Sequence, residues 1–294
     1  PLLLCGSPGT GKSMLATRLP GILPPLTSAE ALEIAAIRSA SGQPATHSRR
    51  APFLSCHAST SPAGLLGGGQ PPRPGNISLA HHGVLMMDEL TEFRRTVIES
   101  LREPLETGRI TLSRGPYSET FPARFLLVAT MNPCPCGNLG DPARACRCTP
   151  AQIRRYQARL SGPLLERFDL GIEMMREPTK DVPAAPAPES SATVARRVQA
   201  ARQRQLTRQA CTNGHLPVGR FDDCLGLQPD ARALLTQAAD RFGWSWRSQH
   251  RVLRVARTVA DLADSATVTP AHLAEAMALR RPLDHLVSAE ANPA

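Results

Sequence analysis

Short apolar runs alternate with amphipathic stretches over residues 1–178. The clearest runs lie at residues 1–5, 83–87 and 125–130, and each has the length of one buried strand. Strands that alternate with helical patterns are typical of an α/β fold with a parallel sheet. The pattern therefore predicts an α/β domain that ends near residue 178.

The pattern changes after this domain. Residues 179–192 are rich in Pro, Ala and Ser and show no apolar period, which indicates a linker. Helical spacing then returns in four stretches, at residues 193–210, 229–242, 248–263 and 270–281. We therefore expect a small all-α domain over residues 193–287.

Composition narrows the class of protein. With 41% hydrophobic and 20% charged residues, the 294-residue chain is neither disordered nor fibrous. It has no apolar stretch of membrane-spanning length and no signal peptide, so we expect a cytoplasmic protein without a membrane partner. The chain begins with Pro1 at the start of a strand, which indicates a piece of a longer chain.

The chain is basic. Its 34 Lys and Arg outnumber 25 Asp and Glu, which gives a net charge of +9 and favours an anionic partner such as a nucleotide or nucleic acid. Part of this charge lies on one predicted helix, at Arg196, Arg197, Arg202, Arg204 and Arg208. A solvated helix face is the favoured interpretation of these arginines.

The strongest motif follows the first strand and matches G-x-x-x-x-G-K-[ST]. It consists of Gly6, Ser7, Pro8, Gly9, Thr10, Gly11, Lys12 and Ser13, with a helical stretch at residues 14–19 behind it. Glycines let loop amides approach phosphates, a lysine adds positive charge at the β- and γ-phosphates, and a serine hydroxyl reaches Mg²⁺. The motif predicts ATP and Mg²⁺ binding; the alternative is a glycine-rich turn with an incidental lysine.

Polar residues follow two later strands. Asp88 and Glu89 end the run at 83–87, where Asp88 would hold Mg²⁺ through water and Glu89 would polarise the attacking water. Asn132 follows the run at 125–130 and would orient the same water. A plain acidic strand end and an asparagine that caps a helix are the competing interpretations.

Four of the eight cysteines lie in two C-x-C pairs, and they are Cys134, Cys136, Cys146 and Cys148. Two such pairs on a turning loop can supply four thiolates to one tetrahedral ion, which predicts a structural Zn²⁺ site. Reduced, unliganded thiols are the alternative, because disulfides are rare in cytosolic proteins.

The sequence between these motifs resembles that of a known family. Residues 66–69 (LGGG), 74–85 (PGNISLAHHGVL) and 131–137 (MNPCPCG), together with the phosphate loop, are similar to the magnesium-chelatase-like AAA+ ATPases of the ComM/YifB family. The resemblance implies an AAA+ P-loop core with a helical lid and ATP hydrolysis in a homo-oligomeric ring, expected to be a hexamer. It also implies a competence-associated motor on DNA, with branch migration or helicase activity in transformation and recombination. The family's Lon-like domain precedes the phosphate loop, and nothing in this sequence corresponds to it.

The resemblance also assigns roles to two arginines. Residues 161–169 (SGPLLERFD) are similar to the arginine-finger segment, with Arg167 offered to a neighbouring subunit. Residues 246–258 are similar to the second sensor helix, where Arg247 aligns best and Arg251 is the reserve. The alternatives are a surface ion pair and a solvated helix face.

Another candidate arginine lies in a predicted β-hairpin at residues 106–121, whose strand patterns flank a Gly-Pro turn. In related rings this hairpin points into the channel, so Arg114 is a candidate for phosphate contact with DNA; an exposed arginine without a partner is the alternative. This chain departs from the family in one segment. The family has a Pro-His-His-containing segment there, and in this chain only His57 matches it.

Two other functions stay open. One is a chelatase-type motor that remodels a protein partner, and the other is an inactive nucleotide-binding remnant.

Overall fold

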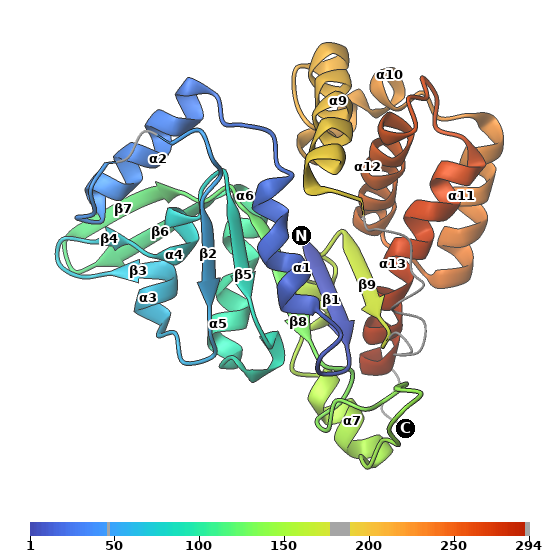
Figure 1. Ribbon diagram of the computed structural model, residues 1–294, viewed down its shortest axis with the longest axis horizontal. Helices are drawn as coiled ribbons and strands as arrows, with labels where there is room; N and C mark the ends of the chain where they lie inside the picture. The colour runs from blue at the N-terminus through green and yellow to red at the C-terminus, as the bar shows by residue number, and fades with distance from the viewer. Residues whose placement is uncertain (46–47, 177–188, 292–294) are drawn as a thin grey trace.

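The computed structural model describes residues 1–45, 48–176 and 189–291 and shows an α/β core beside a helical domain (Figure 1). The core is built on a fully parallel sheet in the order β2-β5-β8-β1-β9. Its strands are β1 (Leu2–Gly6), β2 (Phe53–Cys56), β5 (Val84–Met87), β8 (Leu126–Met131) and β9 (Leu170–Met174). The predicted α/β class is confirmed, and the three predicted strands are β1, β5 and β8.

Both faces of this sheet are covered, which explains why its strands are apolar throughout. Leu3, Leu85 and Leu127 belong to the hydrophobic cluster on one face. Their neighbours Leu4 and Met86 belong to the cluster on the other face, where α1 (Lys12–Arg18) packs through Ala16. Because the strands are parallel, the residues that follow β1, β5 and β8 meet at one edge of the sheet.

Short helices and two small sheets complete the core. The helices are α2 (Ser28–Ala40), α3 (Pro62–Leu66), α4 (Asn76–Leu79), α5 (Arg95–Ser100), α6 (Arg102–Thr107), α7 (Pro150–Gln157) and α8 (Gly162–Leu165). The small antiparallel sheets pair β3 (Gly67–Gly68) with β4 (Arg73–Pro74) and β6 (Arg109–Arg114) with β7 (Tyr117–Pro122). The second pair is the predicted hairpin.

The helical domain contains α9 (Ser191–Gln209), α10 (Phe221–Leu225), α11 (Pro229–Phe242), α12 (Trp246–Leu262) and α13 (Pro270–Ala291). The four predicted helices are present as α9, α11, α12 and α13. The predicted linker at 179–192 falls outside the described residues up to residue 188, and α9 begins within its last two positions. Helix α12 begins two residues earlier than expected because the Ser245 hydroxyl caps it.

The last helix corrects the expectation that helical spacing ends at residue 281. Helix α13 continues to Ala291 through Pro282, a residue that normally interrupts a helix. Leu283 is fully buried in the hydrophobic cluster of the core, and a side chain at Gly171 of β9 would meet it at 3.0 Å. Packing of α13 onto the sheet thus outweighs the local preference of proline.

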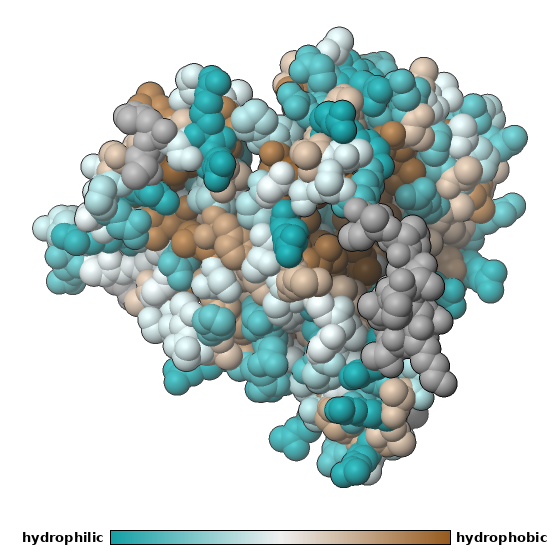
Figure 2. Space-filling view, in the orientation of Figure 1, coloured by the Kyte–Doolittle hydropathy of each residue, from teal (hydrophilic) through white to brown (hydrophobic). Residues whose placement is uncertain are grey.

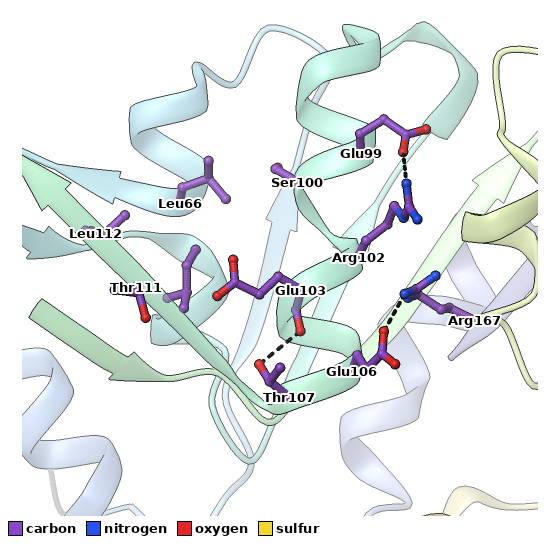
Figure 3. Close-up of a pocket in the computed structure, with 11 residues that line it drawn as sticks. Leu66, Glu99, Ser100, Arg102, Glu103, Glu106, Thr107, Thr111, Leu112 and Arg167 are labelled. Atoms are coloured by element: carbon purple, nitrogen blue, oxygen red, sulfur yellow. Dashed lines mark hydrogen bonds and ion pairs between the residues drawn. The ribbon is translucent and has the colours of Figure 1, made fainter.

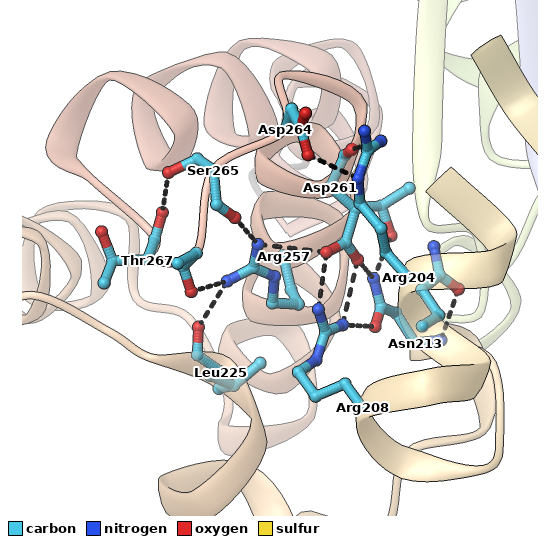
Figure 4. A network of polar contacts seen from close by, with 12 residues as sticks. Arg204, Arg208, Asn213, Leu225, Arg257, Asp261, Asp264, Ser265 and Thr267 are labelled. Atoms are coloured by element: carbon cyan, nitrogen blue, oxygen red, sulfur yellow. Dashed lines mark hydrogen bonds and ion pairs between the residues drawn. The ribbon is translucent and has the colours of Figure 1, made fainter. Parts of the chain in front are cut away.

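A buried polar network holds α9 against α12 (Figure 4). The carboxylate of Asp261, 1% exposed, accepts hydrogen bonds from Arg208 Nη1 at 2.6 Å and Asn213 Nδ2 at 2.8 Å. Buried Arg257 lies 3.1 Å from the same carboxylate, and Arg204 pairs with Asp264 at 2.6 Å. The expectation of a solvated arginine face on α9 was therefore wrong for Arg204 and Arg208, since their acidic partners, on α12 and in the turn after it, cannot be read from α9 itself.

Within the described ranges, the structure has no helix whose length and apolar content would let it span a lipid bilayer.

Candidate nucleotide site

The phosphate loop connects β1 to α1 at the carboxyl edge of the sheet. Gly9 and Gly11 have φ of +83° and +86°, conformations that favour glycine. At Gly6 a Cβ atom would lie 2.3 Å from the carbonyl oxygen of Met174, so no side chain fits there. The sequence thus lets the loop curl tightly, as the binding of phosphate by backbone amides requires.

The lysine of this loop lies over its own backbone. Lys12 Nζ donates to the carbonyl oxygens of Gly6 at 2.6 Å and Ser7 at 3.0 Å. It also donates to Asn132 Oδ1 at 3.2 Å, which joins the ends of β1 and β8. Burial lowers the pKa of Lys12, while Asp88 and Glu89 act in the opposite direction and favour its charged form.

The acidic pair after β5 reaches the same edge. Ser13 Oγ donates to Asp88 Oδ1 at 3.1 Å, so a hydroxyl and a carboxylate lie side by side. Oxygen donors of this kind are the ligands that Mg²⁺ prefers. These residues fit the ion that the phosphate loop implies, and the ion would neutralise charge on the phosphates.

Thr130, near the end of β8, connects the two acidic residues and was not anticipated. Its hydroxyl donates to Asp88 Oδ1 at 2.6 Å and accepts from the backbone N–H of Glu89 at 2.9 Å. Glu89 itself is exposed and has φ +54°, a rare conformation for a residue other than glycine. Thr130 thus holds the turn in which Glu89 projects from the strand end.

The two arginines assigned by resemblance lie at the other edge of the sheet. Arg167 follows α8 and precedes β9, so it lies at the amino ends of the strands, away from this chain's phosphate loop. It is 7% exposed, and it is paired with Glu106 of α6, beside a hollow of about 560 Å³ (Figure 3). Arg247 at the start of α12 donates to the other oxygen of Glu106 at 2.6 Å.

Glu106 was not singled out from the sequence, yet it joins core and helical domain. The hydrogen bond and positive charge of Arg167 hold the pKa of Glu106 below its usual range, and the charge of Arg247 adds to this effect. Arg251, the reserve sensor residue, pairs instead with Asp169, whose backbone N–H donates to the carbonyl oxygen of Pro1 at 3.0 Å. The structure therefore groups Arg167 with Arg247 and places Arg251 beside the start of β1.

The four cysteines of the two C-x-C pairs come together after β8. The Sγ–Sγ distances are 3.5 Å for Cys134 with Cys136, and 3.7 Å from Cys146 to each of these two residues. All four Sγ atoms lie within 4.8 Å of one another. Sulfur atoms around a tetrahedral Zn²⁺ are separated by about 3.8 Å, so the donor set fits this ion. Backbone N–H groups of Arg147 and Asn138 lower the pKa of Cys136 to about 6. Desolvation and the neighbouring thiols of Cys136 and Cys134 raise the pKa of Cys146 and Cys148.

Two further candidate residues lie apart from these groups. Arg114 ends β6 opposite Tyr117 at the tip of the hairpin, and its side chain lies outside the described part of the structure. His57 follows β2 and is exposed.

Comparison with known proteins identifies the family. Residues 1–182 match the family described as magnesium chelatase, subunit ChlI, and residues 188–280 match its C-terminal family. The chain is 47% identical over 282 residues to YifB of Escherichia coli, covering 95% of this chain and 55% of that protein. It is 44% identical over 283 residues to the competence protein ComM of Haemophilus influenzae, with the same coverage.

The chain is also 41% identical over 294 residues to Rv2897c of Mycobacterium tuberculosis, covering 95% of this chain and 57% of that protein. The chain spans about half the length of these curated relatives. The resemblance drawn from the motifs is thus confirmed, and the parallel sheet with its helical domain agrees with the AAA+ architecture. The chain belongs to the magnesium chelatase ChlI family of AAA+-type ATPases, with YifB and ComM among its relatives.

Proposed function

We propose that this chain hydrolyses ATP with Mg²⁺ at a site shared by two neighbouring subunits of a ring. The observation that carries the proposal is the division of the candidate residues between two edges of the sheet. Lys12, Ser13 and Asp88 gather at the carboxyl edge. Arg167 and Arg247 converge on Glu106 at the other edge, so each chain carries two halves of a site.

At the carboxyl edge, the loop residues Gly6 to Ser13 bind the phosphates, and Lys12 places its charge on the β- and γ-phosphates. Ser13 and Asp88 hold the ion. Glu89 polarises the attacking water and Asn132 orients it, a role that its contact with Lys12 supports.

At the other edge, Arg167 and Arg247 face the nucleotide of the next subunit and stabilise the charge that develops on its phosphates. Such head-to-tail contacts close into a ring, for which a hexamer is expected.

Exposed apolar residues on both sides support this contact between subunits. Met14 and Leu15 are 62% and 40% exposed on α1, where apolar side chains reach the surface (Figure 2), and Trp246 is 75% exposed beside Arg247. Residues 1–178 then form the nucleotide-binding core, and residues 193–287 form the lid that carries Arg247.

The motor acts on DNA in this proposal. The net charge of +9, the hairpin that carries Arg114, and the similarity to a competence protein from Haemophilus influenzae support a DNA partner. Branch migration or helicase work in transformation and recombination is the activity that the family resemblance favours.

We also propose that Cys134, Cys136, Cys146 and Cys148 bind one structural Zn²⁺, on the evidence of their sulfur separations. Zinc content of the purified chain should be one ion per chain and should fall to background in Cys136→Ser combined with Cys146→Ser.

Steady-state ATP hydrolysis tests the proposed motor. It is measured with and without single-stranded and branched DNA for the unmodified chain, Lys12→Ala and Arg167→Ala. We expect DNA to accelerate hydrolysis and both substitutions to abolish it. Mixing the two inactive variants should restore part of the activity, because an intact phosphate loop then meets an intact arginine from its neighbour.

The outcomes separate the alternatives. Hydrolysis that DNA does not change would contradict the DNA motor and favour a machine that remodels a protein. No hydrolysis above the Lys12→Ala level would leave an inactive nucleotide-binding remnant. Equal activity of Arg167→Ala and the unmodified chain would overturn the shared site.

A further inference from the structure

Residues 133–149, here called the Cys loop, connect β8 to α7 and contain neither helix nor strand. Loops of this length without regular structure are uncommon in compact domains unless something holds them. The Cys loop has short turns of its own, such as the hydrogen bond from Gly137 N to the carbonyl oxygen of Cys134 at 2.9 Å. The cysteine cluster joins its two ends, since Cys134 Sγ lies 3.7 Å from Cys146 Sγ.

The Cys loop lies directly against the phosphate loop. A Cβ atom on Gly137 would come within 2.6 Å of Pro8 Cδ, and Gly137 has φ +78°, so glycine is required on both counts. The backbone of the Cys loop therefore touches the ring of the third residue of the phosphate motif, with no space left between them.

A buried carboxylate makes the second contact. The side chain of Asp141 is 0% exposed and accepts from Arg176 Nε at 3.3 Å. Arg176 Nη2 in turn donates to the carbonyl oxygen of Pro8 at 3.2 Å. The backbone N–H of Ala143 donates to Asp141 at 2.8 Å and lowers the pKa of this carboxyl, an effect to which the charge of Arg176 and the hydroxyl of Ser7 add.

These contacts hold Ser7 and Pro8, while Asn132, just before the Cys loop, holds Lys12. The phosphate loop must keep Gly9 and Gly11 in left-handed conformations to present its amides. A rigid neighbour lowers the number of competing conformations of the phosphate loop, and apparent affinity falls in proportion to the fraction of molecules in the competent conformation.

We propose that Zn²⁺ bound by the four cysteines keeps the Cys loop folded as a support for the phosphate loop, so that ATP affinity depends on metal occupancy. This inference rests on the proposed zinc site and on the proposed nucleotide site. It adds a regulatory dependence that neither site has by itself. If the Cys loop without metal holds the supporting conformation in one molecule in ten, the Kd for ATP rises about tenfold.

The experiment uses the whole chain in zinc-loaded and chelator-treated forms. Zinc content, the Kd of a fluorescent ATP analogue (mant-ATP) and thermal unfolding are measured on each form, and zinc is then added back. We expect removal of zinc to raise the Kd about tenfold, and added zinc to restore it. Cys136→Ser combined with Cys146→Ser should behave as the metal-free form, whereas Cys211→Ser, outside the cluster, should behave as the unmodified chain.

Asp141→Ala separates the support from the metal, because it removes the buried contact and leaves all four thiols. It should retain one zinc and still bind mant-ATP about tenfold more weakly. A Kd that is unchanged by zinc removal in a zinc-binding chain overturns the coupling and leaves both proposed sites standing. A chain that binds no zinc overturns the coupling together with the metal site. A zinc-loaded chain that binds no mant-ATP, at the level of Lys12→Ala, overturns the nucleotide site and the coupling with it.

Discussion

Thr130 is the residue through which the two acidic groups of the candidate site are connected. Replacing it by Val keeps the shape and removes both hydrogen bonds, to Asp88 and from the N–H of Glu89. We expect kcat for ATP to fall about 10- to 100-fold, in the range found when an outer partner of a functional ligand is lost. The Kd of mant-ATP should change little, because the described hydrogen bonds of the Thr130 hydroxyl go to Asp88 and Glu89 and none goes to the phosphate loop. Thr120→Val, which removes a hydroxyl pair in the exposed hairpin, is the matched control, and equal loss in both variants would contradict the role of Thr130.

His81 is a second residue whose environment has a measurable consequence. Its Nδ1 accepts from the N–H of Arg124 at 3.0 Å, so its neutral ring carries the proton on Nε2 and donates to Glu33 at 2.9 Å. Burial lowers the pKa of His81 from 6.5, and the nearby His82 and Arg124 lower it further. Glu33 acts in the opposite direction and raises it. The unfolded chain therefore takes up this proton first as the pH falls.

Linkage gives the sign of the effect. Because the folded pKa is depressed, stability is retained above pH 6.5 and decreases as the pH is lowered through and below this value. Thermal unfolding between about pH 7.5 and about pH 5.5 should show this decrease, and His81→Gln, which keeps a donor and an acceptor but cannot titrate, should reduce it. Identical pH profiles for both proteins would show that His81 does not contribute.

At the scale of elements, the packing of α9 on α12 depends on one buried carboxylate. Asp261→Asn leaves Arg257 and Arg208 without their countercharge, and breaking a buried pair of this kind costs about 3–5 kcal/mol. Urea unfolding of the helical domain should show this loss. The control is Asp264→Asn, because the Asp264 side chain is 75% exposed and pairs with Arg204. This substitution should lower the free energy of unfolding by at most about 1 kcal/mol. Equal effects of the two substitutions would contradict the network as drawn in Figure 4.

At the scale of the whole molecule, Glu106 joins the core to the lid through Arg167 and Arg247. In the proposed ring, Glu106 positions both arginines without touching the nucleotide. Glu106→Gln removes the charge that holds them and should lower kcat for ATP at least about tenfold, a fraction of what an arginine finger contributes. The Kd of mant-ATP should stay the same, because Glu106 lies at the edge of the sheet away from the phosphate loop.

Glu103→Gln is the matched control for Glu106. Glu103 lines the same hollow one turn earlier on α6, and within the described residues it pairs with neither arginine. Unchanged hydrolysis in Glu106→Gln, or an equal decrease in both variants, would exclude a positioning role.

The sequence by itself determined the parts of this protein that rest on neighbouring residues. The phosphate loop, the acidic pair at 88–89, Asn132 and the cysteine pairs each follow an apolar strand, and parallel strands bring their ends to one edge whatever their order. Only the tertiary structure decided which side chains meet across the sheet. Asn132 reaches a lysine 120 residues away, and Arg167 and Arg247 share one carboxylate. Pairings of this kind depend on strand order and on the docking of the lid, and no local pattern encodes either. The passage of α13 through Pro282 has the same origin, because contacts with β9 outweigh the preference of that single residue.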